Sequence, residues 1–362
     1  MAQVRFVIPK LPPDTPEGIL FLTGDHRQWS NDPAGWTFSG RELQVELPEG
    51  ALLGVKVRVL HDGQTTEEGD IWGGRTPAHK AVVGGDMEIR LQLEGWQDAR
   101  QGRERPSACA PPREELTLDA PWGPQVVRLW WSGSPTQPLP LLLLHDGQNV
   151  FDEASTFAGE SWNVAGAAQT LAAEGFPCLI AALSVNDERN RRYGPFPFEL
   201  NGFNPGADGY LDWIVDTLKP ALAERFGVGD AAHTALAGSS FGGLVTLYGG
   251  LRGFAKHSPA EFGTLGVFSP AIFPADFELL RWMEGREASQ TRVWLDMGDR
   301  EASTLEAAAE MVQLTHQLAD KLRPKMREVH VTIGVDHWHD EAAWAERFPA
   351  FLRWWLEGLP SR

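Results

Sequence analysis

The hydrophobic pattern of this 362-residue chain changes between residues 97 and 126, and each side of the change constrains the fold differently. Before it, apolar and polar residues alternate with a period of two, as at Leu43, Val45 and Leu47. This alternation is typical of strands that bury one face. After it, short apolar runs alternate with amphipathic stretches. That pattern predicts strands and helices in turn, and hence a mostly parallel sheet covered on both faces.

The pattern divides the chain into three segments. Residues 1–97 are expected to form a small all-β sandwich, because their strands are short and are separated by Asp-Gly and Gly-Gly turns. Residues 98–117 lack periodicity and are rich in Arg, Glu and Pro, which predicts an interdomain linker. Residues 118–362 are expected to form an α/β domain. Its predicted strands are Val126–Trp131, Leu139–His145, Cys178–Val185, His233–Ala237, Leu265–Ser269, Arg292–Met297 and Val329–Ile333.

Composition excludes several classes of partner. The chain has 49 acidic and 32 basic residues and a net charge of -17, which argues against binding to nucleic acid or to anionic membranes. No apolar run is long enough to span a bilayer. The first sixteen residues lack a long apolar core and a cleavage site, so we expect no signal peptide and a cytoplasmic location. Cys109 and Cys178 are expected to be free thiols.

The most specific motif is Gly-Ser-Ser-Phe-Gly at residues 238–242. It follows the apolar run Thr234–Ala237 and precedes a stretch, Leu244–Leu251, that is predicted to be helical. A serine in a tight turn between a strand and a helix is a nucleophile elbow, and flanking glycines relieve the crowding of such a turn. The helix directs its free N–H groups at the same place. Ser240 is therefore the predicted nucleophile.

A serine hydroxyl needs a base to take its proton and an acid to orient that base. In enzymes with a nucleophile elbow, the chain order is serine, acid, histidine. His337 and His339 lie in the loop after the last predicted strand, at the same sheet edge as the serine, and spacing alone does not choose between them. Asp299 and Glu301 lie in the loop after strand 292–297 and are the candidates for the acid.

An oxyanion hole is expected beside Ser240. One donor would be the backbone N–H of Phe241, and the other that of Gln148, where Gly147 lets the backbone turn inward. A plain Asp-Gly turn at residues 145–148 is the alternative. No metal is expected at residues 336–340, since two histidines at i and i+2 do not share a helix face and no suitable third ligand accompanies them.

Together these segments resemble the enterochelin esterase-like branch of the esterase D group of α/β-hydrolases. The matching segments are Leu141–Asp152, the Tyr210–Phe226 helix, Ala237–Gly243, Phe268–Phe273, Leu295–Glu301 and His339–Trp344, which span nearly all of residues 120–358 in family order. The resemblance implies an α/β-hydrolase fold and a serine carboxylic ester hydrolase that acts through an acyl-enzyme. It implies a small-molecule ester substrate and no cofactor.

The resemblance also chooses between the candidates for base and acid. The family's histidine is followed by a segment like Asp-Glu-Ala-Ala-Trp, which implies His339 rather than His337. The family's acid stands three residues after the strand-ending glycine, which implies Glu301. Many relatives have aspartate in this loop, so Asp299 stays an alternative. Some related esterases work as a Ser-His pair with a weak third member.

The first segment resembles the immunoglobulin-like modules that precede such esterases and are related to glycogen-binding modules. Leu20–Trp29 matches their pattern of strand, glycine and tryptophan. Trp29, Trp36 and Trp72 either stack on a sugar ring or pack the sandwich core and its interface with the hydrolase domain. A carbohydrate is therefore one candidate partner of this segment, and the sequence does not indicate an oligomeric state.

The loop after the third predicted strand carries three arginines. Arg189, Arg191 and Arg192 either receive an anionic or catecholate substrate, such as a ferric siderophore, or form a solvated charge run with neighbouring acids. Trp162 either walls the acyl pocket or fixes the start of a helix.

Three functions follow from these observations. The first is an esterase acting on siderophore-type or other small esters. The second is a carbohydrate acyl or feruloyl-type esterase whose N-terminal module binds sugar, which the lack of an export signal argues against for extracellular polysaccharide. The third is a non-catalytic binding protein on a hydrolase scaffold, which the presence of Ser240, His339 and an acid candidate argues against.

Overall fold

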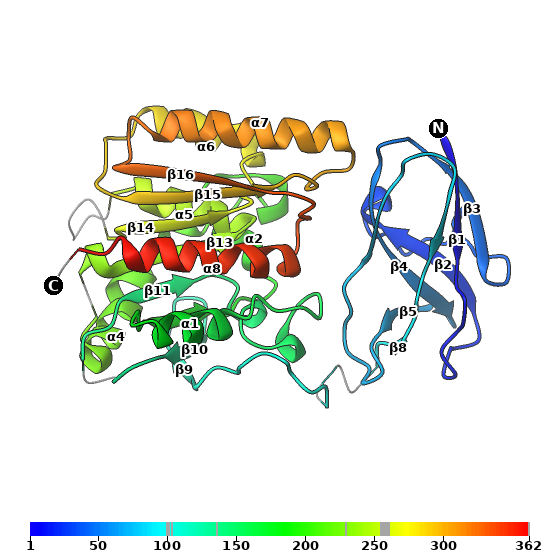
Figure 1. The fold of residues 1–362 in the computed structure, drawn as a ribbon, viewed down its shortest axis with the longest axis horizontal. Coiled ribbons are helices and arrows are strands. Elements are labelled where there is room, and N and C mark those ends of the chain that lie inside the picture. The colour runs from blue at the N-terminus through cyan, green and yellow to red at the C-terminus, as the bar shows by residue number, and fades with distance from the viewer. Residues whose placement is uncertain (99–101, 103, 135–136, 229, 254–260, 361–362) are drawn as a thin grey trace.

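The computed structural model describes residues 1–98, 102, 104–134, 137–228, 230–253 and 261–360, which form two domains side by side (Figure 1). The N-terminal domain is all-β. Its strands are β1 (Ala2–Val7), β2 (Ile19–Gly24), β3 (Glu42–Leu47), β4 (Leu52–His61), β5 (Gln64–Gly69), β6 (His79–Val82), β7 (Met87–Arg90) and β8 (Gly95–Trp96), with a single short helix, η1 (Asp25–Arg27), among the residues described there.

Two sheets make up this N-terminal sandwich. In one, β1 pairs antiparallel with β3 and parallel with β7; in the other, the order is β2-β4-β5-β8, with β6 pairing with β4. Val4 and Phe6 of β1 are fully buried, whereas Arg5 between them is exposed. Val55 and Val57 of β4 close the same core from the other sheet. The period-two pattern therefore produces two sheets that share one apolar core.

The second domain is built on an eight-stranded sheet in the order β16-β15-β14-β13-β11-β12-β10-β9. Its strands are β9 (Glu114–Leu118), β10 (Gln125–Trp131), β11 (Leu141–Leu144), β12 (Leu179–Leu183), β13 (Thr234–Ser239), β14 (Thr264–Phe268), β15 (Arg292–Gly298) and β16 (Glu328–Gly334). β10 runs antiparallel to both of its neighbours, and the strands from β12 to β16 are parallel. All seven strands predicted for this domain are present within two residues of the expected bounds.

The sequence did not predict β9. Residues 114–117 fall in the expected linker, but they pair with β10 at the edge of the sheet. Their alternating burial, with Glu115 and Thr117 exposed, suits an edge strand that has one solvated face. A short polar strand of this kind has too little apolar character to be distinguished from a linker by periodicity.

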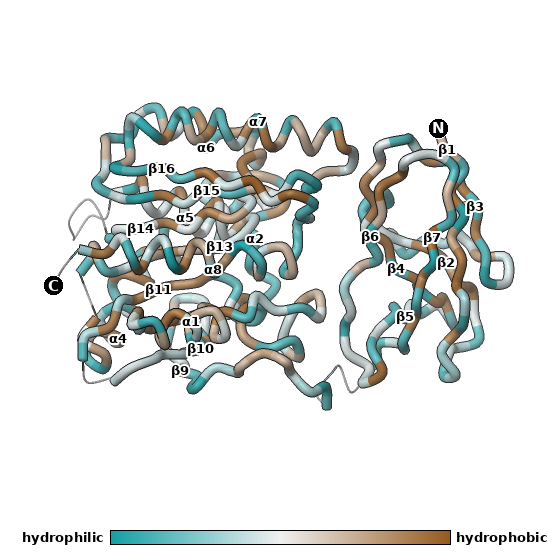
Figure 2. The backbone as a smooth tube through the Cα atoms, viewed as in Figure 1, coloured by the Kyte–Doolittle hydropathy of each residue, from teal (hydrophilic) through white to brown (hydrophobic). Residues whose placement is uncertain are grey.

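Helices cover both faces of the large sheet. The helices are α1 (Val164–Ala173), α2 (Arg189–Tyr193), α3 (Ala207–Trp213), α4 (Lys219–Phe226), α5 (Phe241–Leu251), α6 (Pro274–Glu284), α7 (Leu305–Leu322) and α8 (Glu341–Glu357), with a π-helical turn, η5 (Ile214–Leu218), between α3 and α4. Leu141 and Leu143 of β11 pack with α3 to α7, while Leu142 and Leu144 pack with α1 and α8. β11 at the centre of the sheet is accordingly apolar on both faces, and its tube is brown in Figure 2.

Further short helices follow several strands or connect loops: η2 (Gly147–Asn149), η3 (Glu153–Ser155), η4 (Glu199–Asn201) and η6 (Ala231–His233). In the part of the chain that the structure describes, no helix is both long and apolar enough to cross a membrane. The parallel strands all end at one edge of the sheet. Ser240 follows β13 at that edge, the loop of Glu301 follows β15, and the loop of His339 follows β16.

Candidate active site

Ser240 occupies a strained turn between β13 and α5. Its φ and ψ are 57° and -121°, a combination that a residue with a side chain rarely adopts. Three backbone hydrogen bonds fix this conformation: the Ser240 N–H donates to the Phe268 carbonyl at 3.0 Å, and the N–H groups of Leu244 and Ala271 donate to the Ser240 carbonyl, each at 3.0 Å. The strain is thus held in place by both neighbouring elements.

Glycines beside Ser240 are required by close approach of other groups. A Cβ at position 238 would lie 2.9 Å from the His145 ring, and one at position 243 would lie 2.9 Å from the Phe268 carbonyl oxygen. Real Cβ atoms essentially never come within 3.0 Å of another group, so either substitution would displace backbone or ring. These glycines are therefore needed for the turn to pack against its neighbours.

His339 is joined to Glu301. The Nδ1 atom of His339 lies 2.7 Å from Oε2 of Glu301, whose side chain is 1% exposed, while the imidazole itself is 44% exposed. Loss of solvent around the ring lowers the pKa of His339, but the charge of Glu301 and the hydrogen bond to it raise the pKa further, and the net shift is upward. A carboxylate in this position fixes the tautomer that leaves Nε2 free to accept a proton.

Glu301 is itself held by three donors to its Oε1 atom. They are the Gly298 N–H at 2.7 Å, the Ser269 hydroxyl at 2.6 Å and the Nη2 of Arg347 at 3.2 Å. Ser269 directly follows Phe268, whose carbonyl accepts the Ser240 N–H, so a short series of contacts links the Ser240 turn to the Glu301–His339 pair. Within the described residues, no hydrogen bond joins the Ser240 hydroxyl to His339; such bonds often tighten only when substrate binds.

Arg347 is the residue of this network that the sequence did not reveal. It is 5% exposed on α8 and forms ion pairs with Asp296 at 3.3 Å and Glu301 at 3.2 Å. Burial raises the pKa of Asp296 to about 7, although Arg347 lowers it. A lone arginine on an amphipathic helix gives no signal in sequence, because its partners lie on other elements.

Neither alternative, His337 or Asp299, takes part in the Glu301–His339 pair. The Nδ1 atom of His337 lies 2.9 Å from Arg347, and its Nε2 lies 3.0 Å from Glu346. Asp299 has a buried Oδ1 atom without a hydrogen-bond partner in the structure. The geometry thus joins Glu301 to His339 and places neither alternative in that pair.

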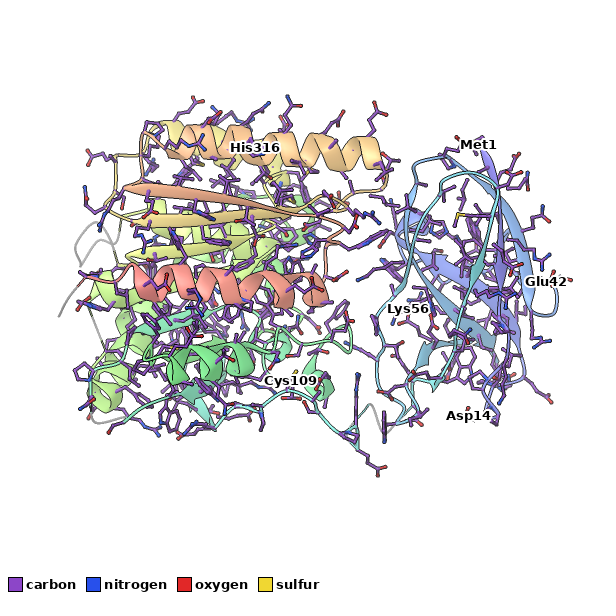
Figure 3. All side chains as sticks on the ribbon, in the orientation of Figure 1. Met1, Asp14, Glu42, Lys56, Cys109 and His316 are labelled. Carbon is purple, nitrogen blue, oxygen red and sulfur yellow. The ribbon has the colours of Figure 1, made fainter. Side chains whose placement is uncertain are left out.

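The other histidines after Ser240 lie elsewhere. His330 stacks on Trp294 with ring centroids 4.2 Å apart, and His316 is exposed on α7 (Figure 3). His257 lies outside the described residues.

The two N–H groups expected to form an oxyanion hole lie at the ends of neighbouring strands. Phe241 begins α5 after β13, and Gln148 lies in η2 after β11, which pairs in parallel with β13. The left-handed residue of this second turn is Asp146, with φ 55°, rather than Gly147. Gly147 is needed because a Cβ there would lie 2.6 Å from the Ala182 carbonyl oxygen of β12.

The three arginines that follow β12 differ in their surroundings. Arg189 pairs with both oxygens of Asp146, at 2.7 and 2.8 Å, and its side chain remains 29% exposed. Arg191 is 41% exposed and lies 3.9 Å from Glu188. Arg192 is 5% exposed and its guanidinium lies over the Trp122 ring. Arg189 and Arg191 can therefore reach a ligand from solvent, whereas the position of Arg192 favours a structural role.

Trp162 belongs to the core. It is 4% exposed and its ring lies 5.2 Å from Phe268, 5.6 Å from Trp344 and 6.0 Å from Phe348. Of the two interpretations of this residue, its position favours packing over direct contact with an acyl group.

The residues described here offer no cluster of three or more His, Cys, Asp or Glu side chains able to hold a metal ion. Cys109 is half-buried and Cys178 is buried, and both are free thiols. Cys109 lies beside Glu153, and burial together with that carboxylate raises the pKa of its thiol to about 11.

A mostly parallel sheet covered on both faces, with the strained Ser240 turn between β13 and α5 at its carboxyl edge, is typical of an α/β-hydrolase-like fold. Residues 126–355 match the model of the Esterase family, described as "Putative esterase", and the chain belongs to this family.

The chain is also similar to a curated protein and to several solved structures. The siderophore triacetylfusarinine C esterase of Aspergillus fumigatus is 32% identical over 130 residues, which are 33% of this chain and 42% of that protein. The chain thus matches less than half of this relative's length. The enterobactin esterase of Shigella flexneri, solved in the presence of enterobactin, has a TM-score of 0.59 and 16% identity over 98% of this chain and 92% of its own. The BES protein of Bacillus cereus has a TM-score of 0.51 and 18% identity over 67% and 94%. At these identities the solved structures show a shared fold.

Proposed function

We propose that this protein is a serine ester hydrolase that cleaves siderophore-type esters through an acyl-enzyme. The observation that carries the proposal is the hydrogen bond that His339 Nδ1 donates to buried Glu301, at the sheet edge where the elbow presents Ser240. A strained serine and a histidine oriented by a carboxylate are the parts that acyl transfer needs. Asp299 is the alternative acid, but its Oδ1 atom has no hydrogen-bond partner, whereas Glu301 contacts the His339 imidazole.

The reaction would run in two halves. Ser240 Oγ attacks the ester carbonyl carbon while His339 Nε2 takes the hydroxyl proton, and the carbonyl π electrons move onto the oxygen. The N–H groups of Phe241 and Gln148 would stabilise this oxyanion. When it collapses, the bond to the alcohol breaks and His339 protonates the leaving oxygen. Water, deprotonated by His339, then attacks the acyl-enzyme and releases the carboxylic acid and free Ser240.

We infer the substrate class from two arginines of α2 and from the similar proteins named above. The Arg189 guanidinium lies over the Phe241 ring of the elbow, and Arg191 of the same short helix is 41% exposed; both would attract an anionic or catecholate ligand. The relatives named above include esterases of two siderophores. Ferric siderophore esters are therefore the proposed substrates, and the two free thiols support a reducing compartment such as the cytoplasm.

The N-terminal sandwich is proposed to be an immunoglobulin-like module. Its tryptophans give little support to sugar binding: Trp36 is half-buried, with His26 4.4 Å from its ring centroid and the Arg27 guanidinium 5.4 Å from it. Both contacts occupy surface that a sugar ring would need. Trp29 is 37% exposed and remains open to a ligand.

A substrate panel with two variants tests the proposal. The wild type is expected to hydrolyse short-chain p-nitrophenyl esters and ferric siderophore esters, and to be labelled by a fluorophosphonate at Ser240. Ser240→Ala should abolish both turnover and labelling while keeping the circular dichroism spectrum. Ser39→Ala, in the N-terminal sandwich, is the matched control and should behave as wild type. A wild-type protein that neither turns over any ester nor reacts with the label would refute the enzyme hypothesis.

A further inference from the structure

The N-terminal sandwich contacts three loops at the carboxyl edge of the large sheet. In Figure 1 the sandwich stands on the side of the α/β domain opposite the C-terminus. The three loops are those that precede α7, precede α8 and follow η2. Each of them adjoins one group of the proposed active site, and each contact involves a different part of the sandwich.

The first contact is with the loop of the acid. The Leu52 N–H donates to the Ser303 carbonyl at 2.9 Å, and the Leu305 N–H donates to the Gly50 carbonyl at 2.8 Å. Together they form a short antiparallel bridge between β4 and the chain that enters α7. Ser303 follows Glu301 by two residues, so the bridge fixes the far end of the loop that carries the carboxylate.

The second contact is with the loop of the base. Lys80 of β6 forms an ion pair with Asp340, the residue after His339, and the two side chains are 29% and 16% exposed. The other oxygen of Asp340 accepts the Ala343 N–H at 3.0 Å and so caps α8. One carboxylate therefore ties together the sandwich, the base and the helix that begins beside it.

The third contact is with the segment after the oxyanion loop. The Arg75 guanidinium donates to the Phe157 carbonyl at 3.2 Å, and Gly159 lies so close to Arg75 that a Cβ there would be 2.1 Å from its carbonyl oxygen. The Phe157 N–H donates to the side chain of Asn149 at 3.0 Å. Asn149 follows Gln148, whose N–H is a proposed oxyanion donor.

We propose that the N-terminal sandwich is a positioning element of the active site, which braces the loops of Glu301, His339 and Gln148 through these three contacts. The inference rests on the proposed function, because it concerns the same site. Lys80 and Gly159 are then positioning residues: neither carries out a chemical step, but both keep groups that do so in place. A sandwich that only bound a ligand of its own would leave turnover unchanged when these contacts are altered.

A pair of glycine substitutions separates interface contact from backbone strain. Gly159 and Gly63 have nearly equal φ values, 76° and 75°, so alanine adds similar strain at both. A Cβ at position 63 meets nothing within 4 Å, whereas at position 159 it drives into the sandwich. Gly159→Ala is expected to lower kcat/KM by about 10- to 100-fold, since small misplacements of reacting groups have effects of this size. Gly63→Ala should keep the wild-type kcat/KM.

A second pair of substitutions, Lys80→Met and Lys10→Met, reports on the proposed base, His339. Lys80→Met removes a cation beside Asp340, so the pKa of His339, measured by NMR titration, is expected to rise, and Lys10→Met should leave it unchanged. The charged groups around the imidazole are those of Glu301, Glu341, Arg189, Asp25 and Asp340. Lys80→Met changes the surroundings of Asp340 alone among these groups, and Lys10→Met changes none of them.

The outcomes distinguish this inference from the proposed function. If the wild type hydrolyses esters and Ser240→Ala does not, yet Gly159→Ala and Lys80→Met match the wild type in kcat/KM and in the His339 titration, the bracing role is refuted and the esterase stands. If the wild type is inactive, the proposed function fails. The His339 titration of Lys80→Met against Lys10→Met then still decides whether the sandwich acts on this loop.

Discussion

Replacing Arg347 by methionine tests how the proposed acid is held. The guanidinium is 5% exposed between Asp296 and Glu301, whose side chains are 0% and 1% exposed. Arg347→Met leaves these two buried carboxylates without their cation. Removing one partner of a buried ion pair destabilises a protein by about 3–5 kcal/mol. That is a large part of the roughly 5–15 kcal/mol by which a domain is stable.

The loss should depend on pH in a defined direction. Burial already raises the pKa of Asp296 to about 7, and removal of Arg347 raises it further. The folded variant then keeps a proton above pH 7 that both the folded wild type and the unfolded chain have released. Since the folded variant binds more protons than its unfolded state, its free energy of unfolding falls as the pH rises. The deficit relative to wild type should therefore be larger at about pH 8.5 than at about pH 6.

Urea unfolding followed by far-UV circular dichroism at both pH values measures this deficit. Arg353→Met is the matched control, because Arg353 is on the same helix but is 41% exposed and pairs with Glu174 and Glu357 at the surface. It should lose much less stability than Arg347→Met, because exposed ion pairs contribute little. If Arg347→Met is no less stable than Arg353→Met at either pH, Arg347 does not neutralise the buried carboxylates and the argument is wrong.

Two further substitutions probe the proposed catalytic groups. Glu301→Gln should lower kcat by about 10²- to 10⁴-fold and move the acid limb of the kcat/KM profile to lower pH, because Glu301 raises the pKa of His339; an acid limb that stays in place would contradict the pairing. Gly147→Ala should lower kcat by about 100-fold, since its Cβ would lie 2.6 Å from the Ala182 carbonyl and would displace the oxyanion loop. Gly84→Ala, whose Cβ meets nothing within 4 Å, is its control, and equal activities would argue against the loop's role.

The parts of the fold that local pattern encodes were predictable. The seven predicted strands of the large sheet are mostly apolar, so each stands out from its flanks, and the elbow is marked by glycines at fixed spacing. From the residues alone, His337 and His339 were equivalent, because both lie in the same loop. The resemblance favoured His339, and in the structure His339 is the one that contacts Glu301.

What the sequence could not provide depends on contacts between distant segments. Arg347 and Asp296 lie 51 positions apart, and neither has a local partner that marks it as part of a network. Arg192 and Trp162 were each open to two interpretations, because burial is decided by elements that pack over a residue rather than by its neighbours in the chain. β9 was missed for a different reason: a short polar edge strand has too little apolar character to stand out.

The rigidity of the elbow has a consequence for engineering. Positions 238 and 243 admit no Cβ without displacing the His145 ring or the Phe268 backbone, and Ser240 is pinned on both sides by amide hydrogen bonds. Mutant libraries that randomise this turn would be populated almost entirely by misfolded or inactive clones. Arg189 also supports these turns, because it pairs with Asp146 and lies over the Phe241 ring. Diversity aimed at new ester preferences belongs instead at Arg191, whose side chain is 41% exposed.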